Sequence, residues 1–314
     1  MKLTRITGIV AGLSLLVAGM QAQVSLPAVF TDHMVLQQKS EVPVWGWGSA
    51  SATIKVVGSW APQDTATTVV RSDGTWDTTL KTIGAGGPYT LSVLGDGTRE
   101  LKDVMLGEVW LCSGQSNMEW TPMHGIDNSE EEVAAANYPN IRFFHIPKRG
   151  AATPQNNCEA SWAPCTPDRM KSTSAIAYFF GRDLQKDLNV PVGLIVSAWG
   201  GTPAEVWVPE EQVMNNPRIR DVMPDKTYPW WPVEPGVLYN QMISPVVPYA
   251  LAGAIWYQGE SNRDHPDSYG ILLKTMVESW RKSFKKDFPF YLVKISPFTY
   301  KENHNGAAMV REHQ

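Results

Sequence analysis

The sequence has no excess of charge of one sign. Lys and Arg together number 27 and Asp and Glu 31, so the formal net charge is -4 over 314 residues. Nucleic acids and acidic lipids are bound by strongly basic surfaces, so we expect neither as a partner. The length allows two domains, or one large α/β domain with an addition.

Long hydrophobic runs are also scarce, and the clearest one is N-terminal. Lys2 and Arg5 precede apolar residues 6–20, and the small residue Ala22 suits a cleavage site. The run is shorter than the roughly 20 residues that cross a bilayer. A secretory signal peptide over residues 1–22 is therefore favoured over a membrane anchor, and we expect a secreted or periplasmic protein without membrane attachment.

Cysteine is rare, with three residues in the chain. Cys158 and Cys165 lie seven residues apart in a loop-like segment, so they can form a disulfide in an oxidising compartment. Cys112 falls in an expected strand and is interpreted as a buried apolar residue. Cys and His lack the spacing of metal ligands and no glycine-rich phosphate motif is present, so we expect neither metal nor cofactor.

The hydrophobic pattern changes near residue 102. Before it, short segments of β-branched and aromatic residues are separated by Gly, Pro and Asp-Gly, with no helical period. This pattern predicts an all-β sandwich over residues 23–102, with a structural or sugar-contacting role.

From residue 103 to 314, strand-like and helical segments alternate. The expected strands are 104–111, 141–146, 193–197, 251–257 and 290–295. The expected helices are 129–137, 174–188 and 269–284. Alternation of this kind predicts an α/β domain with a doubly wound parallel sheet, in which ligands bind at the carboxyl ends of the strands.

Small polar residues follow three of the expected strands. The segments are SGQSN at 113–117, SAWGGT at 197–202 and YQGESN at 257–262. One such cluster arises easily by chance, but three at the same topological position indicate a site. We therefore expect the three turns to face one cavity.

These residue types suit acyl transfer. Ser116 stands at a strand-to-helix turn, where an exposed hydroxyl can attack a carbonyl carbon. The negative charge that forms on the carbonyl oxygen requires hydrogen-bond donors, and the backbone N–H of Ser116 is one candidate. The other candidates for donors or substrate contacts are Gln115, Gly200, Gly201, Gln258 and Asn262.

The motifs GQSNM, WGGTPAEVW, LYNQMISPVVPY and IWYQGESN resemble those of the sialate O-acetylesterases, within the SGNH or GDSL-like hydrolases. The resemblance runs from residue 103 to 314 and implies a flavodoxin-like SGNH fold. It implies that Ser116 is the nucleophile and that Gly201 and the 258–262 loop belong to the oxyanion hole. Glu260 is implied to orient the catalytic histidine, and the alternative is a structural carboxylate bonded to loop amides.

The base that should activate Ser116 is not evident. The family resemblance implies an Asp-x-x-His block, but none of the six histidines has an Asp three residues before it. The final segment, VREHQ, resembles one that lies upstream of that block, so we expect a C-terminally incomplete chain with feeble or no esterase activity. His265 is an alternative base, although a solvated loop position is commoner; His304 is interpreted as an exposed turn residue.

Tryptophan is abundant, with 13 residues. Trp110, Trp256 and Trp280 are expected in the core. Those expected near the rim of the site are Trp120, Trp199, Trp207, Trp230 and Trp231. Flat aromatic faces suit sugar rings, so the expected substrate is an O-acetylated sugar, and by resemblance O-acetylated sialic acid. The alternatives are acetylated plant polysaccharide, and a noncatalytic carbohydrate-binding protein that lacks the base.

Overall fold

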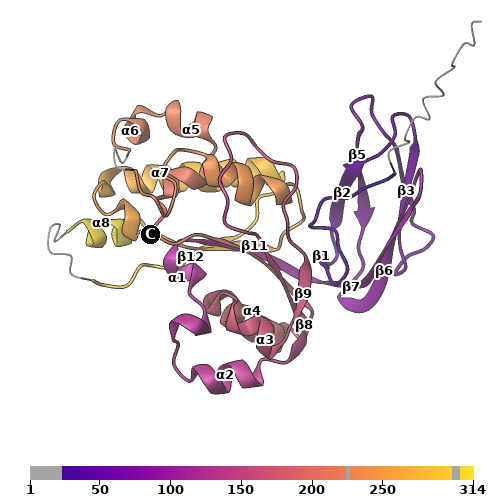
Figure 1. The fold of residues 1–314 in the computed structure, drawn as a ribbon, viewed down its shortest axis with the longest axis horizontal. Helices are drawn as coiled ribbons and strands as arrows, with labels where there is room; N and C mark the ends of the chain where they lie inside the picture. The colour runs from indigo at the N-terminus through magenta and orange to yellow at the C-terminus, as the bar shows by residue number, and fades with distance from the viewer. Residues whose placement is uncertain (1–22, 224–226, 299–304) are drawn as a thin grey trace, which may run out of the picture.

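The computed structural model describes residues 23–223, 227–298 and 305–314. Figure 1 shows a small β-rich part beside a larger part in which helices lie on both faces of a sheet. Within these ranges no helix is both long and apolar enough to cross a membrane. The expected signal peptide, residues 1–22, lies outside the described residues.

The β-rich part consists of two facing sheets. In one, β2 (Glu41–Trp47) pairs antiparallel with β5 (Thr75–Lys81). The strands of the other, in spatial order, are β4 (Ala66–Val69), β3 (Thr53–Gly58), β6 (Gly86–Leu94) and β7 (Thr98–Gly114). Alternate residues of β2 and β3 are buried in the same hydrophobic cluster, as expected for sheets with one solvated face.

β7 belongs to both parts of the molecule. Its first half pairs antiparallel with β6, while β1 (Val35–Gln37) runs parallel to residues 105–107. Its second half, from Glu108 onward, pairs in parallel with two strands of the larger sheet. The expected boundary at residues 102–103 therefore falls inside one continuous strand, and the two parts share a structural element.

The larger sheet confirms the predicted doubly wound α/β arrangement. Its strands, in spatial order, are β9 (Trp162–Cys165), β8 (Tyr138–His145), β10 (Val192–Ala198), β7, β11 (Gly253–Tyr257) and β12 (Phe290–Leu292). All are parallel except β9, which pairs antiparallel with β8. Numbered along the chain, the five parallel strands lie in the order second, third, first, fourth and fifth. β7 is therefore central, and the step from β10 to β11 on its other side is the switch point of a doubly wound sheet.

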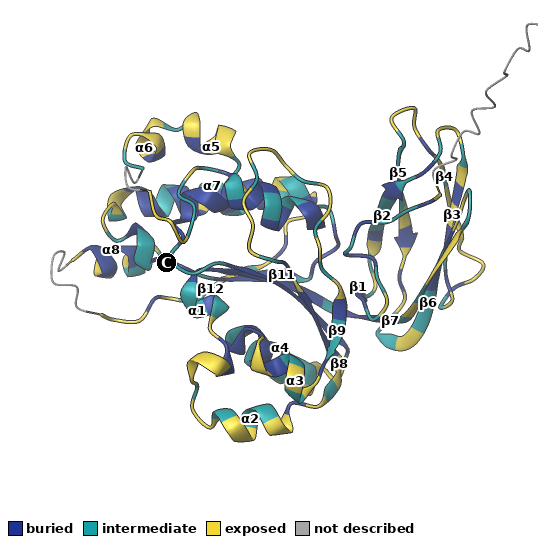
Figure 2. Ribbon diagram, in the orientation of Figure 1, coloured by how far each residue is buried: buried dark blue, intermediate teal, exposed yellow. Residues whose placement is uncertain are grey.

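Helices cover both faces of this sheet (Figure 1). On one side lie α1 (Ser116–Glu119), α2 (Ser129–Ala135), α3 (Pro167–Lys171) and α4 (Ala175–Leu188). On the other lie α5 (Glu210–Met214), α6 (Pro217–Arg220), α7 (Pro266–Phe284) and α8 (Gly306–His313). Short 3-10 or π turns occur at Pro122–His124, Ala204–Trp207, Tyr239–Ile243, Ser244–Val246 and Glu260–Asn262. Figure 2 shows buried residues on the strands and on the inner sides of α4 and α7.

The predicted helix at 174–188 is confirmed as α4. The Ser174 hydroxyl caps it by accepting a hydrogen bond from the Ala177 N–H at 3.0 Å. Its buried face is centred on Ala177, Tyr178 and Gly181, whereas Leu188 at its C-terminal end is 51% exposed. α4 packs closely on the sheet at Gly181, where an added Cβ would lie 2.5 Å from the Leu194 side chain of β10.

The possible disulfide between Cys158 and Cys165 is absent, because both thiols are free. The two side chains pack on different hydrophobic clusters. Cys165 belongs to the cluster that also contains Cys112 and residues of α4, whereas Cys158 packs against the cluster that contains residues of α7. Cys112 is fully buried, as predicted.

Candidate active site

The three polar turns meet at one edge of the larger sheet. β7 is the central strand, and Gly114 at its end is level with Ala198 of β10 and Tyr257 of β11. The Gln115 N–H donates to the Tyr257 carbonyl oxygen at 3.0 Å, and the Trp199 N–H donates to that of Gly114 at 3.1 Å. An added Cβ at Gly114 would lie 2.1 Å from the Tyr257 oxygen, so this junction requires glycine.

Ser116 is the first residue of α1 and is partly exposed. At the first turn of a helix the backbone N–H groups have no intrahelical partner, so this N–H is free to act as a donor to a ligand. The second turn passes directly beside it, because a Cβ added at Gly200 would lie 3.3 Å from the Ser116 Cβ. The serine and the glycine pair therefore share one wall of the site.

The two glycines of the second turn differ in their hydrogen bonding. The Gly200 N–H donates to Glu119 Oε2 at 2.5 Å, and Glu119 Oε1 accepts from Lys148 Nζ at 2.6 Å. Gly201 has φ +81°, and its N–H has no hydrogen-bond partner in the described part of the chain. The sequence did not distinguish Gly200 from Gly201 as a donor to the substrate. In the structure, the Gly201 N–H is the one available for this role.

The third turn is held against the first two by direct hydrogen bonds. Gln115 is 3% exposed, and its Oε1 accepts from the backbone N–H groups of Gly259 at 3.2 Å and Ser261 at 3.4 Å. The Ser261 hydroxyl donates to the Gly201 carbonyl oxygen at 3.0 Å. The structure thus gives Gln115 a positioning contact between two turns.

The amides of Gln258 and Asn262 are buried and bonded within the protein. Gln258 Nε2 donates to Asn262 Oδ1 at 2.7 Å and to the Thr202 carbonyl oxygen at 3.3 Å. Asn262 Nδ2 donates to both carboxylate oxygens of Glu205, at 2.8 and 3.1 Å. Both predicted side-chain donors thus already have partners in this structure.

Glu205 is a buried carboxylate that we did not single out from the sequence. It is 1% exposed, and burial raises its pKa, while the hydrogen bond from Asn262 opposes that rise. The one sequence signal was a Glu inside the apolar run following WGGT. In the structure, the Glu205 carboxylate accepts the hydrogen bonds of the Asn262 amide and so helps to hold the third turn in place.

Glu260 lies beside α1. The Asn117 Nδ2 donates to Glu260 Oε1 at 2.7 Å, whereas Glu260 Oε2 is buried and has no partner among the described residues. Burial raises the pKa of Glu260, and hydrogen bonds from its own backbone N–H and from Asn117 oppose that rise. A carboxylate with one unpartnered buried oxygen at the edge of a site is a candidate functional group.

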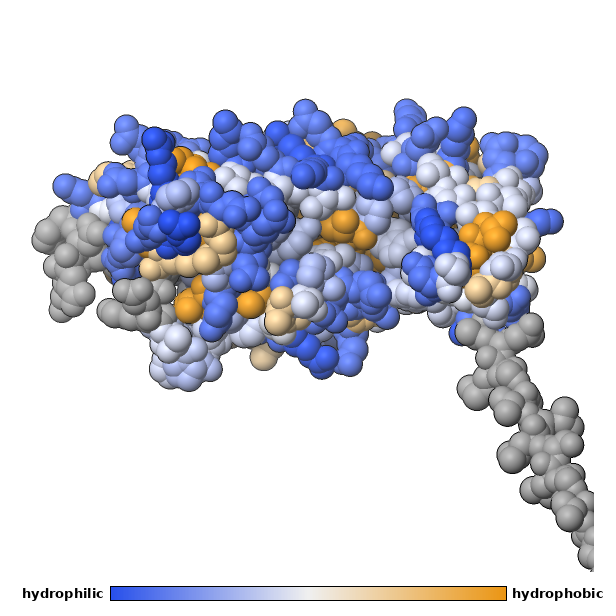
Figure 3. All heavy atoms as spheres, turned by 90° about the horizontal axis from the view of Figure 1, so that it is seen from above, coloured by the Kyte–Doolittle hydropathy of each residue, from blue (hydrophilic) through white to orange (hydrophobic). Residues whose placement is uncertain are grey.

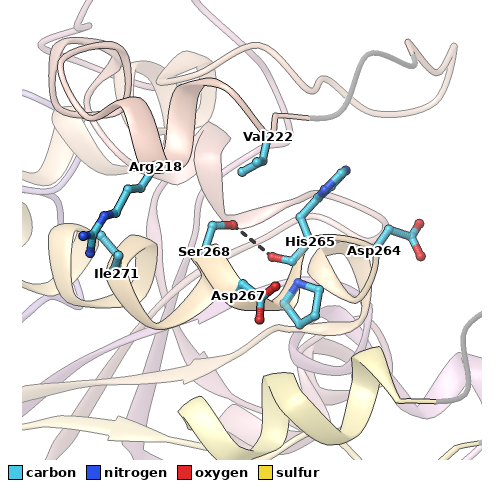
Figure 4. A pocket seen from close by; sticks show the side chains of 8 residues that line it. Arg218, Val222, Asp264, His265, Asp267, Ser268 and Ile271 are labelled. Carbon is cyan, nitrogen blue, oxygen red and sulfur yellow. Dashed lines mark hydrogen bonds between the residues drawn. The ribbon is translucent and has the colours of Figure 1, made fainter.

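His265 immediately precedes α7 and is exposed. It borders a hollow of about 370 Å³ formed with Arg218, Val222, Asp264, Pro266, Asp267, Ser268 and Ile271. Figure 4 shows its carbonyl accepting from the Ser268 hydroxyl while its imidazole extends on the Val222 side. Ser116 is not among the residues that line this hollow, and within the described ranges no histidine is hydrogen-bonded to Ser116.

His304 lies outside the described residues. In the part of the chain that the structure covers, no cluster of three or more His, Cys, Asp or Glu side chains is arranged to hold a metal ion.

Aromatic residues stand beside the second turn. A Cβ added at Gly201 would lie 2.5 Å from the Trp231 indole, which stacks with Tyr228 at a centroid distance of 4.9 Å. Trp230 is 70% exposed, and its carbonyl oxygen accepts from Trp199 Nε1 at 3.2 Å. These contacts place an aromatic wall next to the free amide of Gly201.

The other tryptophans divide between the core and the surface. Trp110, Trp256 and Trp280 are buried, as predicted. Trp207 was expected at the rim, but it is fully buried, and its indole N–H donates to the Thr202 hydroxyl at 3.0 Å. Trp120 is 43% exposed and follows α1.

The doubly wound parallel sheet with polar turns after three adjacent central strands is the SGNH-type fold that the sequence predicted. A family model described as a carbohydrate esterase, sialic acid-specific acetylesterase, matches residues 106–314. The chain therefore belongs to this family of carbohydrate esterases.

Relatives and solved structures agree with this assignment. The chain is 32% identical to proteins named sialate O-acetylesterase from Pongo abelii and Homo sapiens, with 90% of this chain aligned. It spans 59% of the length of these relatives. A carbohydrate acetylesterase from Xanthomonas citri has a similar structure, with a TM-score of 0.82 and 34% identity over 93% of this chain and 65% of that one.

Proposed function

We propose that this protein removes O-acetyl groups from sugars, with O-acetylated sialic acid as its substrate. The observation that carries the proposal is the position of Ser116 beside the Gly200–Gly201 turn, in which the Gly201 N–H is free, at the meeting point of three turns. The names of the relatives, sialate O-acetylesterase and carbohydrate acetylesterase, support the same substrate class.

In the proposed reaction, Ser116 Oγ attacks the acetyl carbonyl carbon. The carbonyl oxygen becomes negatively charged and accepts hydrogen bonds from the N–H groups of Ser116 and Gly201; losing one such donor commonly costs about 3 kcal/mol of barrier. The sugar oxygen then leaves with a proton, and acetyl-Ser116 remains. Attack by water on this ester releases acetate and restores the serine.

The buried amides take a positioning role in this scheme. Gln258 donates to Asn262, and Asn262 donates to Glu205, so these amides fix the third turn rather than the substrate. Gln115 links that turn to the serine, and Glu119 fixes the Gly200 peptide so that the next N–H remains free. The site is therefore preorganised before a substrate binds.

The proton acceptor is assigned to a histidine of the Asp-x-x-His block that the family resemblance implies. Glu260 Oε2 is the candidate acid to orient it, because it is buried beside α1 without a partner in the described ranges. His265 is the alternative base. The His265→Ala variant tests it, because an unchanged rate of acetate release would rule it out.

The aromatic wall is assigned to the sugar. Trp230 presents the largest exposed indole beside the site, and Trp231 lies against Gly201, where the acetyl group would be held. Aromatic faces bury the apolar faces of sugar rings. The wall therefore suits an ester of a sugar.

The experiment is acetate release from O-acetylated N-acetylneuraminic acid and from acetylated xylan, by the unmodified chain and by Ser116→Ala. Ser172→Ala, an exposed serine at the end of α3, is the matched control. We expect release by the unmodified chain to be feeble, because its 314 residues contain no Asp-x-x-His block. That release should be faster from the sialic acid ester, lost in Ser116→Ala and unchanged in Ser172→Ala. Equal release by Ser116→Ala would overturn the assignment.

The two alternatives give different results in the same assay. Faster release from acetylated xylan would identify a polysaccharide deacetylase. Sugar binding by both proteins without acetate release by either would identify a noncatalytic carbohydrate-binding protein. Mass spectrometry of the Ser116 peptide adds a direct readout, because the proposed intermediate carries one acetyl group.

A further inference from the structure

The outward face of the β2–β5 sheet carries tryptophans where small β-domains usually carry polar side chains. Along β2, Val42 and Val44 point into the domain, so Trp45 and Trp47 point outward, and both are partly exposed. They are opposite Asp77 and Thr75 of β5. Aromatic rings with carboxylate and hydroxyl groups beside them make a mixed surface rather than a purely apolar one.

This face forms one wall of a hollow of about 430 Å³ between the two parts of the molecule. From the larger part, Asn156, Pro248 and Lys285 contribute the opposite wall. Lys285 directly follows α7, and Asn156 lies between β8 and β9, so segments far apart in sequence converge on the hollow. Seen from above, the surface is mostly hydrophilic with small apolar patches on both parts (Figure 3).

The tryptophan wall is fixed in place. Trp45 packs edge-on against Phe30 at a centroid distance of 4.7 Å, and Phe30 in turn contacts Tyr249 of the larger part. The Trp47 backbone is paired with Ser25 through two hydrogen bonds of 2.9 Å. Because these side chains are already ordered in the folded protein, a ligand that binds in the hollow loses little affinity to immobilising them.

The charged residues on the rim of the hollow do not neutralise one another completely. The Arg71 guanidinium is paired with the Asp77 carboxylate and also donates to the Thr75 hydroxyl at 3.0 Å. Lys285 is exposed, and its ammonium has no ion-pair partner among residues 23–223, 227–298 and 305–314. The hollow thus offers hydrogen-bonding groups, aromatic faces and one unneutralised positive charge.

We propose that this hollow is a second carbohydrate-binding site, which takes an oligosaccharide that carries a carboxylate. Trp45 and Trp47 stack on sugar rings, Asp77 and Asn156 bind hydroxyls, and Lys285 pairs with the carboxylate. The site lies outside the three-turn cluster, and binding there does not require hydrolysis of the ligand. It gives the N-terminal part, which precedes the region matched by the family model, a function of its own.

The test is calorimetric titration of the full chain carrying Ser116→Ala, which removes the proposed nucleophile and leaves the hollow intact. The probes are 3′-sialyllactose, which has a carboxylate, and lactose, which does not. We expect tighter binding of sialyllactose, and a loss of about tenfold in its affinity, or about 1.4 kcal/mol, in Trp47→Ala. Trp60→Ala is the matched control, because Trp60 is a partly exposed tryptophan of the same domain that packs on Tyr89 outside the hollow.

Lys285→Met provides a second variant at an exposed position that leaves the core untouched. It should lower the affinity for sialyllactose several-fold and leave the affinity for lactose unchanged. The proposal is overturned if Trp47→Ala binds sialyllactose like the parent, if no binding is detected in the parent, or if Trp230→Ala at the three-turn cluster abolishes all binding. Acetate release by the unmodified chain is independent of these outcomes, so the two proposals fail separately.

Discussion

Two carboxylates next to the three turns show how individual side chains shape the candidate site. Glu119 binds a backbone N–H of the glycine pair, and Glu205 binds the amide that supports the third turn. Neither touches Ser116 through a hydrogen bond. Each acts by fixing the backbone that surrounds the serine, so their contributions should appear first in stability.

Glu119→Ala should lower the free energy of unfolding by about 2 kcal/mol, because the Gly200 N–H loses a charge-assisted acceptor. Glu119→Gln should lower it less, since an amide oxygen remains. Lys148→Met is the control, because its partly exposed ion pair with Glu119 is worth less than about 1 kcal/mol. Urea unfolding followed by tryptophan fluorescence measures all three; an unchanged midpoint in Glu119→Ala would contradict the assigned contact.

Glu205 should make stability depend on pH. Burial raises its pKa in the folded protein above the ordinary value of 4.5, so the folded state holds the proton more tightly than the unfolded state. The stabilisation is complete below the unfolded pKa and is lost as pH rises through the folded pKa.

Urea unfolding at a series of pH values above 4.5 tests this dependence. Glu205→Gln mimics the protonated carboxyl, so we expect its free energy of unfolding to fall less with rising pH than that of the parent. Glu211→Gln, an exposed neighbour on α5, should keep the parent slope. A parent-like slope in Glu205→Gln would show that another group is responsible.

At the scale of single elements, β7 connects the β-sandwich, the larger sheet and the candidate active site. It closes one sheet of the β-sandwich, forms the centre of the larger sheet and ends at the serine turn. Asp103 lies in β7 where the strand passes from the β-sandwich to the larger sheet, and its φ is +53°. Its carboxylate accepts hydrogen bonds from the Arg142 guanidinium and pairs with His33. Burial raises the pKa of Asp103, but hydrogen bonds from Arg142 and His33 outweigh it and leave the pKa below its ordinary value.

Asp103→Asn should lower the free energy of unfolding by about 3 kcal/mol, because it leaves the Arg142 side chain, 5% exposed, without an opposite charge. Asn adopts positive φ readily, so the change reports on charge rather than on backbone strain. Asp168→Asn, whose pair with Lys171 is exposed, should change stability by less than about 0.5 kcal/mol. Equal effects of the two variants in chemical denaturation would count against a structural role for the buried pair.

For the molecule as a whole, the two parts are joined by more than a linker. One hydrophobic cluster contains residues of the β-sandwich, such as Val44, and residues of α7, such as Trp280. Phe30 packs against both Trp45 and Tyr249. Separation of the parts would therefore expose apolar surface and would also divide β7.

We expect a single cooperative unfolding transition in differential scanning calorimetry, with equal calorimetric and van't Hoff enthalpies. The same midpoint should be found by far-UV circular dichroism and by tryptophan fluorescence. Two resolved transitions would show that the β-sandwich and the larger part unfold independently, as separate domains joined at residues 102–103 would.

The sequence by itself determined the elements and the residue types of the site. Period-two and helical patterns located the strands and the long helices, since burial of one face imposes those periods. The turns after three strands were recognisable because parallel strands end at one edge. The signature segments also resembled the family to which the chain belongs.

Tertiary structure alone decided how those residues are used. The strand order placed β7 between β10 and β11, which made the three turns neighbours. Contacts between segments 57 to 144 residues apart gave Gln115, Asn262 and Glu119 their partners. The same long-range packing put Trp207 in the core and kept Cys158 and Cys165 unbridged, because hydrogen bonds and burial depend on neighbours in space that local periodicity does not encode.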